Sequence, residues 1–134
     1  YVVVDTSGSM AENNRIGLVQ SALVGLIDSL APTDRLGLVE FATGAEIFTP
    51  DVDGRSGKDH LLQMTTSGKA LAKAALNNLD IGGETNMRSG LETALTYMKR
   101  VRDNLSSTFC HSALLFITDG RDSSIETGRI SKQA

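Results

Sequence analysis

The sequence predicts an α/β fold: a Rossmann-like, doubly wound and mostly parallel sheet, with one short antiparallel edge strand and helices on both faces. Two observations lead to this class. Apolar stretches of strand length alternate with stretches of helical periodicity along the 134 residues. The stretches 1–4 and 112–118 are apolar at successive positions, which is typical of parallel strands that helices cover on each side.

Size and composition restrict the class of protein further. A chain of 134 residues is long enough to bury the core of one domain. Its 40% hydrophobic and 22% charged residues are ordinary for a globular domain. The net charge is -3 and charges of both signs are interspersed, so nucleic acid and anionic membranes are poor partners. No apolar run is long enough for direct insertion into a bilayer.

The first element is a strand that ends in a polar loop. Tyr1–Val4 is apolar and rich in β-branched residues, and Asp5–Ser9 follows with a carboxylate, hydroxyls and a glycine. A helix comes next, because apolar residues recur at helical spacing from Ile16 to Leu30. Pro32 ends this helix, since proline cannot continue its hydrogen-bond ladder.

Two more strands and a polar loop follow this helix. The stretch 35–41 is predicted to be a second buried strand, and a tight turn leads from it into a third strand over 45–49. This third strand should run antiparallel to the second and end at Pro50, as short edge strands do. The stretch 50–58 is predicted to be a solvated turn, because it lacks the ligand set of a calcium-binding loop.

Two helices are predicted in the second half of the chain. Ser67 is expected to cap a helix over 68–78, with Leu71, Ala75 and Leu79 along its core side. A glycine-rich loop over 81–86 precedes the longer helix. The apolar positions of that helix are Met87, Leu91, Ala94, Leu95, Met98, Val101 and Leu105.

The fourth strand, over 112–118, ends at Asp119. Cys110 precedes this strand and is the single cysteine of the chain, so it cannot form a disulfide within it. We expect Cys110 to behave as a small buried apolar residue, with a reactive thiol as the alternative.

Three polar loops should meet at one edge of the sheet. In a parallel sheet every loop from a strand to a helix lies at the same edge, and Asp5 and Asp119 each end a strand there. Thr85 lies just before a helix that begins at this edge. If the first and fourth strands are neighbours, the crevice between them is the usual ligand position of open α/β sheets.

The side chains expected at this edge are two carboxylates and three hydroxyls. Such oxygen donors suit a hard cation, Mg²⁺ above all, with Mn²⁺ or Ca²⁺ as alternatives. Asp5 and Asp119 together only neutralise a divalent ion, so the ion would stay electrophilic and accept one more carboxylate from outside. The pattern therefore predicts a metal site that receives an Asp or Glu of a protein partner.

The same residues resemble a known family. Asp5-Thr6-Ser7-Gly8-Ser9-Met10 is similar to the D-x-S-x-S signature of von Willebrand factor A (VWA) domains, which carry a metal-ion-dependent adhesion site (MIDAS). The stretch 82–86 resembles the loop that bears the family's threonine, and Thr118-Asp119-Gly120 resembles its T-D-G. The resemblance implies that the metal ligands are Asp5, Ser7, Ser9, Thr85 and Asp119.

The resemblance also implies a function and a context. It implies a non-enzymatic interaction or cell-adhesion module that binds a divalent cation and, through it, an acidic residue of a partner protein. It covers residues 1–134, which are expected to be a C-terminally truncated VWA-like domain, because the family normally has two more strands and helices after the T-D-G strand. The stretch after Pro50 and Cys110 resemble the branch of calcium-channel accessory subunits and cache-containing surface proteins. The compartment stays open, with an extracellular or cell-surface location favoured over a cytoplasmic one, and the oligomeric state is not predicted.

Two other interpretations of the first loop compete with a metal site. Ser7 or Asp5 could simply cap the following helix, which would explain one loop but not three loops of matching chemistry. An enzyme is the rival function: a phosphohydrolase of the haloacid-dehalogenase type with Asp5 as nucleophile. That mechanism needs a carboxylate at position 7, where this chain has Ser7. A dinucleotide-binding site is less favoured, because no glycine fingerprint follows the first strand.

Overall fold

The structure, a computed structural model, describes residues 1–104 and 111–119 of the chain. Its main sheet has the strand order β4-β3-β1-β6; β1 is parallel to both of its neighbours, and β4 pairs antiparallel with β3. The strands are Val2–Asp5 (β1), Leu38–Phe41 (β3), Ala45–Ile47 (β4) and Leu115–Ile117 (β6). The predicted sheet, with its short antiparallel edge strand, is confirmed.

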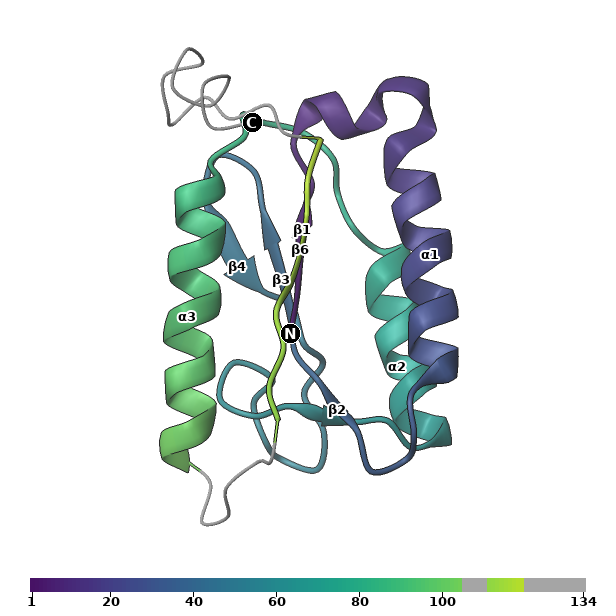
Figure 1. Cartoon of the computed structure of the whole chain (residues 1–134), viewed down its shortest axis with the longest axis vertical. Coiled ribbons are helices and arrows are strands. Elements are labelled where there is room, and N and C mark those ends of the chain that lie inside the picture. The colour runs from purple at the N-terminus through teal and green to yellow at the C-terminus, as the bar shows by residue number, and fades with distance from the viewer. Residues whose placement is uncertain (105–110, 120–134) are drawn as a thin grey trace.

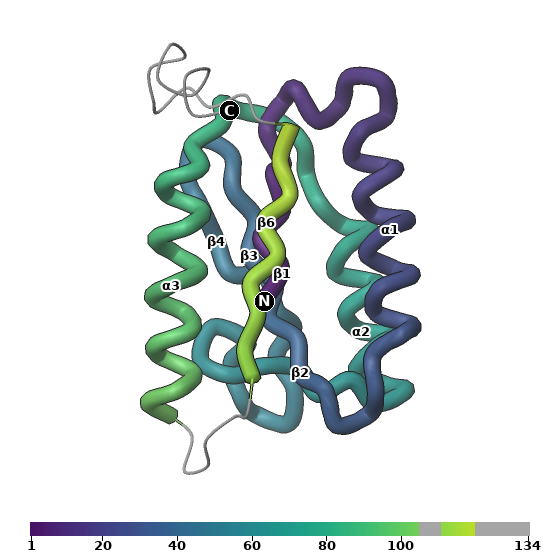
Figure 2. The backbone as a smooth tube through the Cα atoms, viewed as in Figure 1, coloured from purple at the N-terminus to yellow at the C-terminus, as the bar shows by residue number. Residues whose placement is uncertain are grey.

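Helices cover both faces of this sheet (Figure 1). The helices are Arg15–Ser29 (α1), Thr66–Asn77 (α2) and Met87–Asn104 (α3). Figure 2 shows α3 on one side of the strands and α1 with α2 on the other. Successive side chains of β1 point to opposite faces, so Val3 joins the core under α3 while Val2 and Val4 join the core under α1 and α2. The doubly wound α/β class is confirmed.

The second predicted strand is in fact two short strands. β2 (Arg35–Leu36) leaves the main sheet and pairs antiparallel with β5 (Leu62–Gln63), a strand that the sequence analysis did not predict. Gly37 separates β2 from β3, and a Cβ atom at this position would lie 2.7 Å from the Tyr97 ring. The packing of Tyr97 on the backbone therefore requires a glycine where the strand breaks.

A short 3-10 helix, which the sequence analysis also missed, connects β1 to α1. This helix, η1 (Gly8–Asn14), contains Asn13 with φ 52° and ends at Asn14 with φ 54°. Asparagine tolerates this left-handed conformation better than most residues, because its short side chain can form local hydrogen bonds. The two asparagines turn the chain so that α1 begins at Arg15.

The predicted cap and core side of α2 are wrong by a few positions. Thr65, not Ser67, caps the helix: its hydroxyl accepts a hydrogen bond from the Gly68 amide at 3.2 Å. The buried positions are Gly68, Ala72 and Leu76, whereas Leu71 is exposed. Ala75 and Leu79, by contrast, do pack at the border of the core. The small residues Gly68 and Ala72 allow α2 to approach its neighbours closely.

The predicted core side of α3 is confirmed at Ala94 and Val101 and wrong at two of its leucines. Its buried residues are Gly90, Ala94, Tyr97 and Val101. Two positions assigned to the core, Leu91 and Leu95, are 44% and 53% exposed. The predicted Leu105 and Cys110 lie outside the described residues. Tyr97, which the predicted stripe does not include, is fully buried, and a buried tyrosine hydroxyl needs a hydrogen-bond partner.

The Tyr97 hydroxyl belongs to a buried polar network at the edge of the sheet where β1 begins. It donates to the His60 carbonyl oxygen at 2.8 Å and lies 2.8 Å from the Thr49 hydroxyl. Thr49 follows β4, and its hydroxyl accepts a hydrogen bond from the Leu38 amide at 2.8 Å. This side chain replaces a backbone partner, which is why β4 ends before the predicted position 49.

The 50–58 stretch contains the predicted turn, whereas the fourth strand, β6 (Leu115–Ile117), is shorter than the predicted 112–118. Val52 and Arg55 pair across Asp53 and Gly54, which both have positive φ, so this part of the 50–58 stretch is a tight hairpin turn. β6 pairs with β1, so the condition for a crevice between the first and fourth strands is met, but Leu115 is 46% exposed rather than buried. Among the described residues, no helix has the length and apolar character that a membrane crossing requires.

Candidate metal centre

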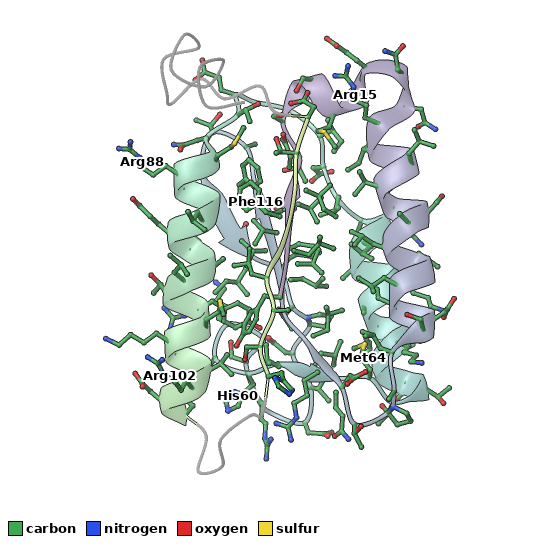
Figure 3. The ribbon with its side chains drawn as sticks, in the orientation of Figure 1. Arg15, His60, Met64, Arg88, Arg102 and Phe116 are labelled. Carbon is green, nitrogen blue, oxygen red and sulfur yellow. The ribbon has the colours of Figure 1, made fainter. Side chains whose placement is uncertain are left out.

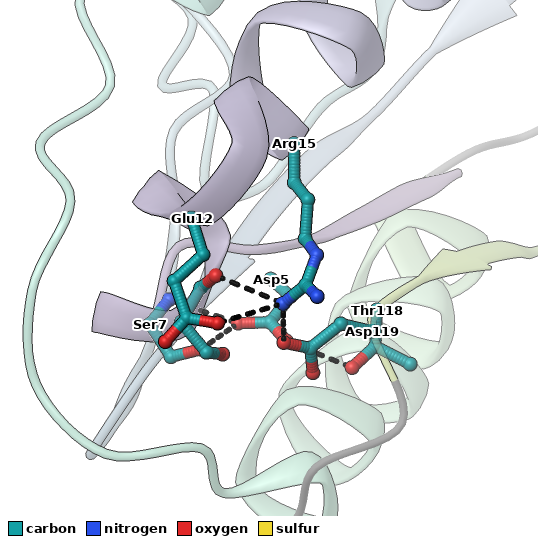
Figure 4. Close-up of polar contacts among 7 residues, drawn as sticks. Asp5, Ser7, Glu12, Arg15, Thr118 and Asp119 are labelled. Carbon is teal, nitrogen blue, oxygen red and sulfur yellow. Dashed lines mark hydrogen bonds and ion pairs between the residues drawn. The ribbon is translucent and has the colours of Figure 1, made fainter.

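Asp5 lies at the centre of a buried polar cluster where β1 ends (Figure 4). The side chain is 0% exposed, and both of its oxygens accept hydrogen bonds. Oδ1 accepts from the Ser7 amide at 2.8 Å and from the Ser7 hydroxyl at 2.5 Å. Oδ2 accepts from the Thr118 hydroxyl at 2.7 Å. These bonds orient the carboxylate and partly replace the water it has lost.

The serines of the first loop face this carboxylate. Ser7 occupies the N-cap position of η1, yet its side chain makes no capping hydrogen bond. Its hydroxyl instead donates to Asp5 and lies 3.2 Å from the Ser9 hydroxyl. An ordinary capped turn would direct the Ser7 oxygen at the helix amides. The Ser7 side chain is therefore not a helix cap, whereas Asp5 does accept a hydrogen bond from a backbone amide of the turn and in addition from the hydroxyls of Ser7 and Thr118.

Thr85 is brought to the same edge by its loop. The Gly82 amide donates to the Thr6 carbonyl oxygen at 3.0 Å, and the Gly8 amide donates to the Gly83 carbonyl oxygen at 3.0 Å. Gly83 has φ 85°, a conformation that favours glycine. Thr85 itself is buried. Two main-chain hydrogen bonds thus hold the threonine loop against the loop of Asp5.

Asp119 follows β6 and reaches the site because β6 lies beside β1. Its side chain is 6% exposed, and its Oδ2 accepts a hydrogen bond from Arg15 Nη1 at 3.2 Å. The same nitrogen lies 3.2 Å from the Ser9 carbonyl oxygen. Arg15 therefore connects the Asp119 loop with the first loop.

The sequence analysis missed two residues of this cluster as site residues. Thr118 had a visible signal, because it directly precedes Asp119 at the end of the predicted fourth strand. Arg15 had a weaker one: it is a cation at the first position of a helix, where the helix dipole disfavours positive charge. Neither signal shows a contact until the strand order and the turn at Asn13 and Asn14 are known.

The donor set fits a hard divalent cation. Asp5 and Asp119 provide carboxylate oxygens, and Ser7, Ser9 and Thr85 provide hydroxyls at the same edge of the sheet. Across residues 1–104 and 111–119 there is no group of three or more His, Cys, Asp or Glu side chains arranged to hold a metal. Oxygen donors with few carboxylates are what Mg²⁺ accepts, because it keeps several waters of its own.

A cavity of about 420 Å³ lies away from this cluster, between the 50–57 loop, β5 and the start of α2. Arg35, Arg55 and His60 are among its lining residues, and none of the five predicted metal ligands is. Figure 3 shows His60 and Arg15 at opposite ends of the molecule. The chemistry of the carboxylates, rather than the size of a cavity, therefore identifies the candidate site.

Comparison with known proteins shows to which domain family this chain belongs. Residues 1–121 match the von Willebrand factor type A domain family, so the chain belongs to that family. Uncharacterized protein YfbK of Escherichia coli K12 is 32% identical over 118 residues, which are 88% of this chain and 18% of YfbK. Inter-alpha-trypsin inhibitor heavy chain H3 of Mus musculus is 29% identical over 119 residues, which are 88% of this chain and 12% of that protein. The chain thus spans less than a fifth of these relatives.

Solved structures share the fold. A von Willebrand factor type A structure from Catenulispora acidiphila has a TM-score of 0.71 and 25% identity, over 98% of this chain and 28% of that one. Proximal thread matrix protein 1 from the mussel byssus, solved with a zinc-occupied MIDAS motif, has a TM-score of 0.62 and 22% identity. That match covers 98% of this chain and 31% of the mussel chain. The mussel structure shows that a domain of this fold can hold a divalent ion at its MIDAS.

Proposed function

We propose that this domain is a non-enzymatic interaction module that binds a divalent cation, Mg²⁺ in the first place, and through it an acidic side chain of a partner protein. The proposed ligands are Asp5, Ser7, Ser9, Thr85 and Asp119. The observation that carries the proposal is the fully buried Asp5 carboxylate, which neutral hydroxyls hold in place beside a second carboxylate. A buried carboxylate is costly unless a cation compensates its charge.

The charge balance supports an acceptor role for the ion. Asp5 and Asp119 bring two negative charges, and the serine and threonine hydroxyls bring none. Two carboxylates only neutralise a divalent ion and add no excess negative charge that would repel a further carboxylate, and such an ion keeps exchangeable waters. A carboxylate from a partner can replace one of those waters, and this step would complete the coordination without any bond being broken in the partner.

The context of the proposed module follows from its relatives. The resemblance to inter-alpha-trypsin inhibitor heavy chain H3 supports an extracellular or cell-surface location. The choice of Mg²⁺ over Mn²⁺ or Ca²⁺ rests on the oxygen donor set alone. The proposed partners are proteins that present an exposed Asp or Glu side chain.

Calorimetric titration with Mg²⁺ and Mn²⁺ tests the metal site. Ser7→Ala removes one ligand and one donor to Asp5, so binding should weaken by more than about tenfold. Ser67→Ala is the matched control, because Ser67 is exposed and lies at the other end of the molecule, at the start of α2. Unchanged metal affinity in Ser7→Ala would exclude Ser7 as a ligand and contradict the proposed site.

The partner step is tested with a pair of peptides. A peptide library with a central Asp should be retained on the metal-loaded domain and released by a chelator, whereas the same library with Asn should not be retained. Retention of both libraries would contradict recognition of a carboxylate. The phosphohydrolase alternative would regain support if the domain hydrolysed a chromogenic phosphate ester and Asp5→Asn abolished that activity.

A further inference from the structure

Arg15 places a positive charge directly on the proposed metal site. Its Nη1 lies 3.2 Å from Asp119 Oδ2, 3.2 Å from the Ser9 carbonyl oxygen and 3.4 Å from Glu12 Oε2. Figure 4 shows this nitrogen between the carboxylates of Glu12 and Asp119. One guanidinium nitrogen thus contacts a proposed ligand and the backbone of another.

The local backbone makes the position of Arg15 unfavourable for a positively charged residue. It is the first residue of α1, where the helix dipole repels a cation, and the chain reaches it through two successive residues in the left-handed conformation. Such local conflicts persist where the surrounding contacts compensate them, and they are frequent at functional sites. Here the compensating contact is the ion pair with Asp119.

The two partners of Arg15 differ in burial. The Asp119 side chain is 6% exposed, whereas the Glu12 side chain is 53% exposed. The pair with Asp119 is therefore less screened by solvent and is the stronger of the two. The Arg15 side chain is 29% exposed, so it has a route to the solvent.

We propose that Arg15 is a built-in counter-cation, which holds Asp119 in the metal-free domain and competes with the divalent ion for that carboxylate. The inference rests on the proposed metal site and adds a determinant of its affinity. When the ion binds Asp119, the guanidinium loses this partner. It keeps Glu12, which it already contacts, so it can turn outward without losing every negative neighbour.

Competition between the two cations predicts opposite effects on metal affinity and on stability. Arg15→Gln should tighten Mn²⁺ binding, measured by calorimetry, by about three- to tenfold, because the ion no longer displaces a guanidinium. The metal-free variant should melt at a lower temperature than the wild-type domain, because the buried Asp119 carboxylate loses its ion pair with Arg15. With saturating Mn²⁺ the two melting temperatures should converge.

Two further variants make this test specific. Arg15→Lys keeps the charge and should stay within about twofold of the wild-type affinity. Arg102→Gln removes the same charge from an exposed position at the far end of α3 and should leave Mn²⁺ affinity unchanged (Figure 3). It controls for the net charge of the domain.

The outcomes separate this inference from the metal site on which it rests. Tighter binding in Arg15→Gln, with a metal-free form that is less stable, supports the competition. Equal or weaker binding, or an equal loss of stability with and without Mn²⁺, assigns Arg15 a merely structural role and overturns the inference while the metal site stands. If neither the wild-type domain nor Arg15→Gln binds Mn²⁺, both proposals are overturned.

Discussion

The two ends of the central sheet each carry a buried polar cluster, and the two clusters are built on different principles. Where β1 begins, Tyr97, Thr49, the Leu38 amide and the His60 carbonyl form a neutral network in which donors meet acceptors. Where β1 ends, Asp5 and Asp119 bring net negative charge, and hydroxyl donors and Arg15 surround it. In the first cluster, the named polar groups are hydrogen-bonded to one another. In the second cluster, the two carboxylates carry more negative charge than Arg15 neutralises, so a cation can still bind.

This difference separates stability from function. A satisfied neutral network rigidifies the core, because every buried group finds its partner. A buried carboxylate lowers stability unless a cation lies near it, and evolution keeps such a group where binding requires it. We therefore expect substitutions at one end to change mainly the free energy of unfolding, and substitutions at the other end to change mainly binding.

The largest expected effect is on binding. Asp5→Ala should weaken Mg²⁺ binding by more than about 100-fold, because a neutral side chain cannot replace the central carboxylate. The free energy of unfolding of the metal-free domain should change by less than about 2 kcal/mol, since the lost hydrogen bonds are offset by removal of a buried charge. Calorimetry and urea denaturation measure the two quantities. If Asp5→Ala unfolded the domain as well as abolishing Mg²⁺ binding, the prediction that this end of the sheet serves mainly binding would be wrong.

Metal removal is expected to have the next largest effect. A chelator should lower the stability of the wild-type domain by about 2.7 kcal/mol relative to metal at 100 times its dissociation constant. The thermal midpoint with and without Mg²⁺ measures this difference. Asp5→Ala is the control and should show no shift. A shift of equal size in the control would locate the stabilising ion elsewhere.

Tyr97→Phe should act at the opposite end. Loss of its hydroxyl removes the hydrogen bond to His60, so the free energy of unfolding should fall by about 1–2 kcal/mol with Mg²⁺ affinity unchanged. Burial raises the pKa of Tyr97 above its ordinary value of 10.0. The folded state therefore favours the protonated phenol, and this contribution to stability is complete below pH 10 and is lost as the pH rises further. Between pH 8 and 11, the free energy of unfolding should therefore decline less steeply with pH in Tyr97→Phe than in the wild-type domain.

The smallest expected effect concerns Glu40 of β3. Burial, with the negative charges of Glu46 and Asp80, raises its pKa above the ordinary value of 4.5. A raised carboxyl pKa means that stability is greatest at low pH and declines as the pH rises above 4.5. Glu40→Gln should therefore stabilise the domain at pH 7 by less than about 1 kcal/mol. Glu84→Gln is the control, because it also removes one negative charge. A larger gain in stability in this variant would show that the net charge of the domain, rather than the site of Glu40, is responsible.

The sequence predicted the sheet and the meeting of the three loops well, because both follow from rules of chain connection. The parallel orientation of β1 and β6 follows from the alternation of strands and helices, whereas the structure is what shows that they are neighbours. Side-chain placement was harder. The buried Tyr97 hydroxyl donates a hydrogen bond to a carbonyl oxygen distant in sequence, and no local periodicity contains that information. Arg15 and Thr118 were missed as site residues for the same reason.

The pair of main-chain hydrogen bonds between residues 6–8 and residues 82–83 has a consequence for the speed of ion capture. These bonds join peptide groups, so the loops of Asp5 and Thr85 are already in register before an ion arrives. Little ordering entropy is then lost on binding. Ion exchange should therefore be limited by release of the ion's own water and by displacement of Arg15 from Asp119, rather than by closure of these two loops.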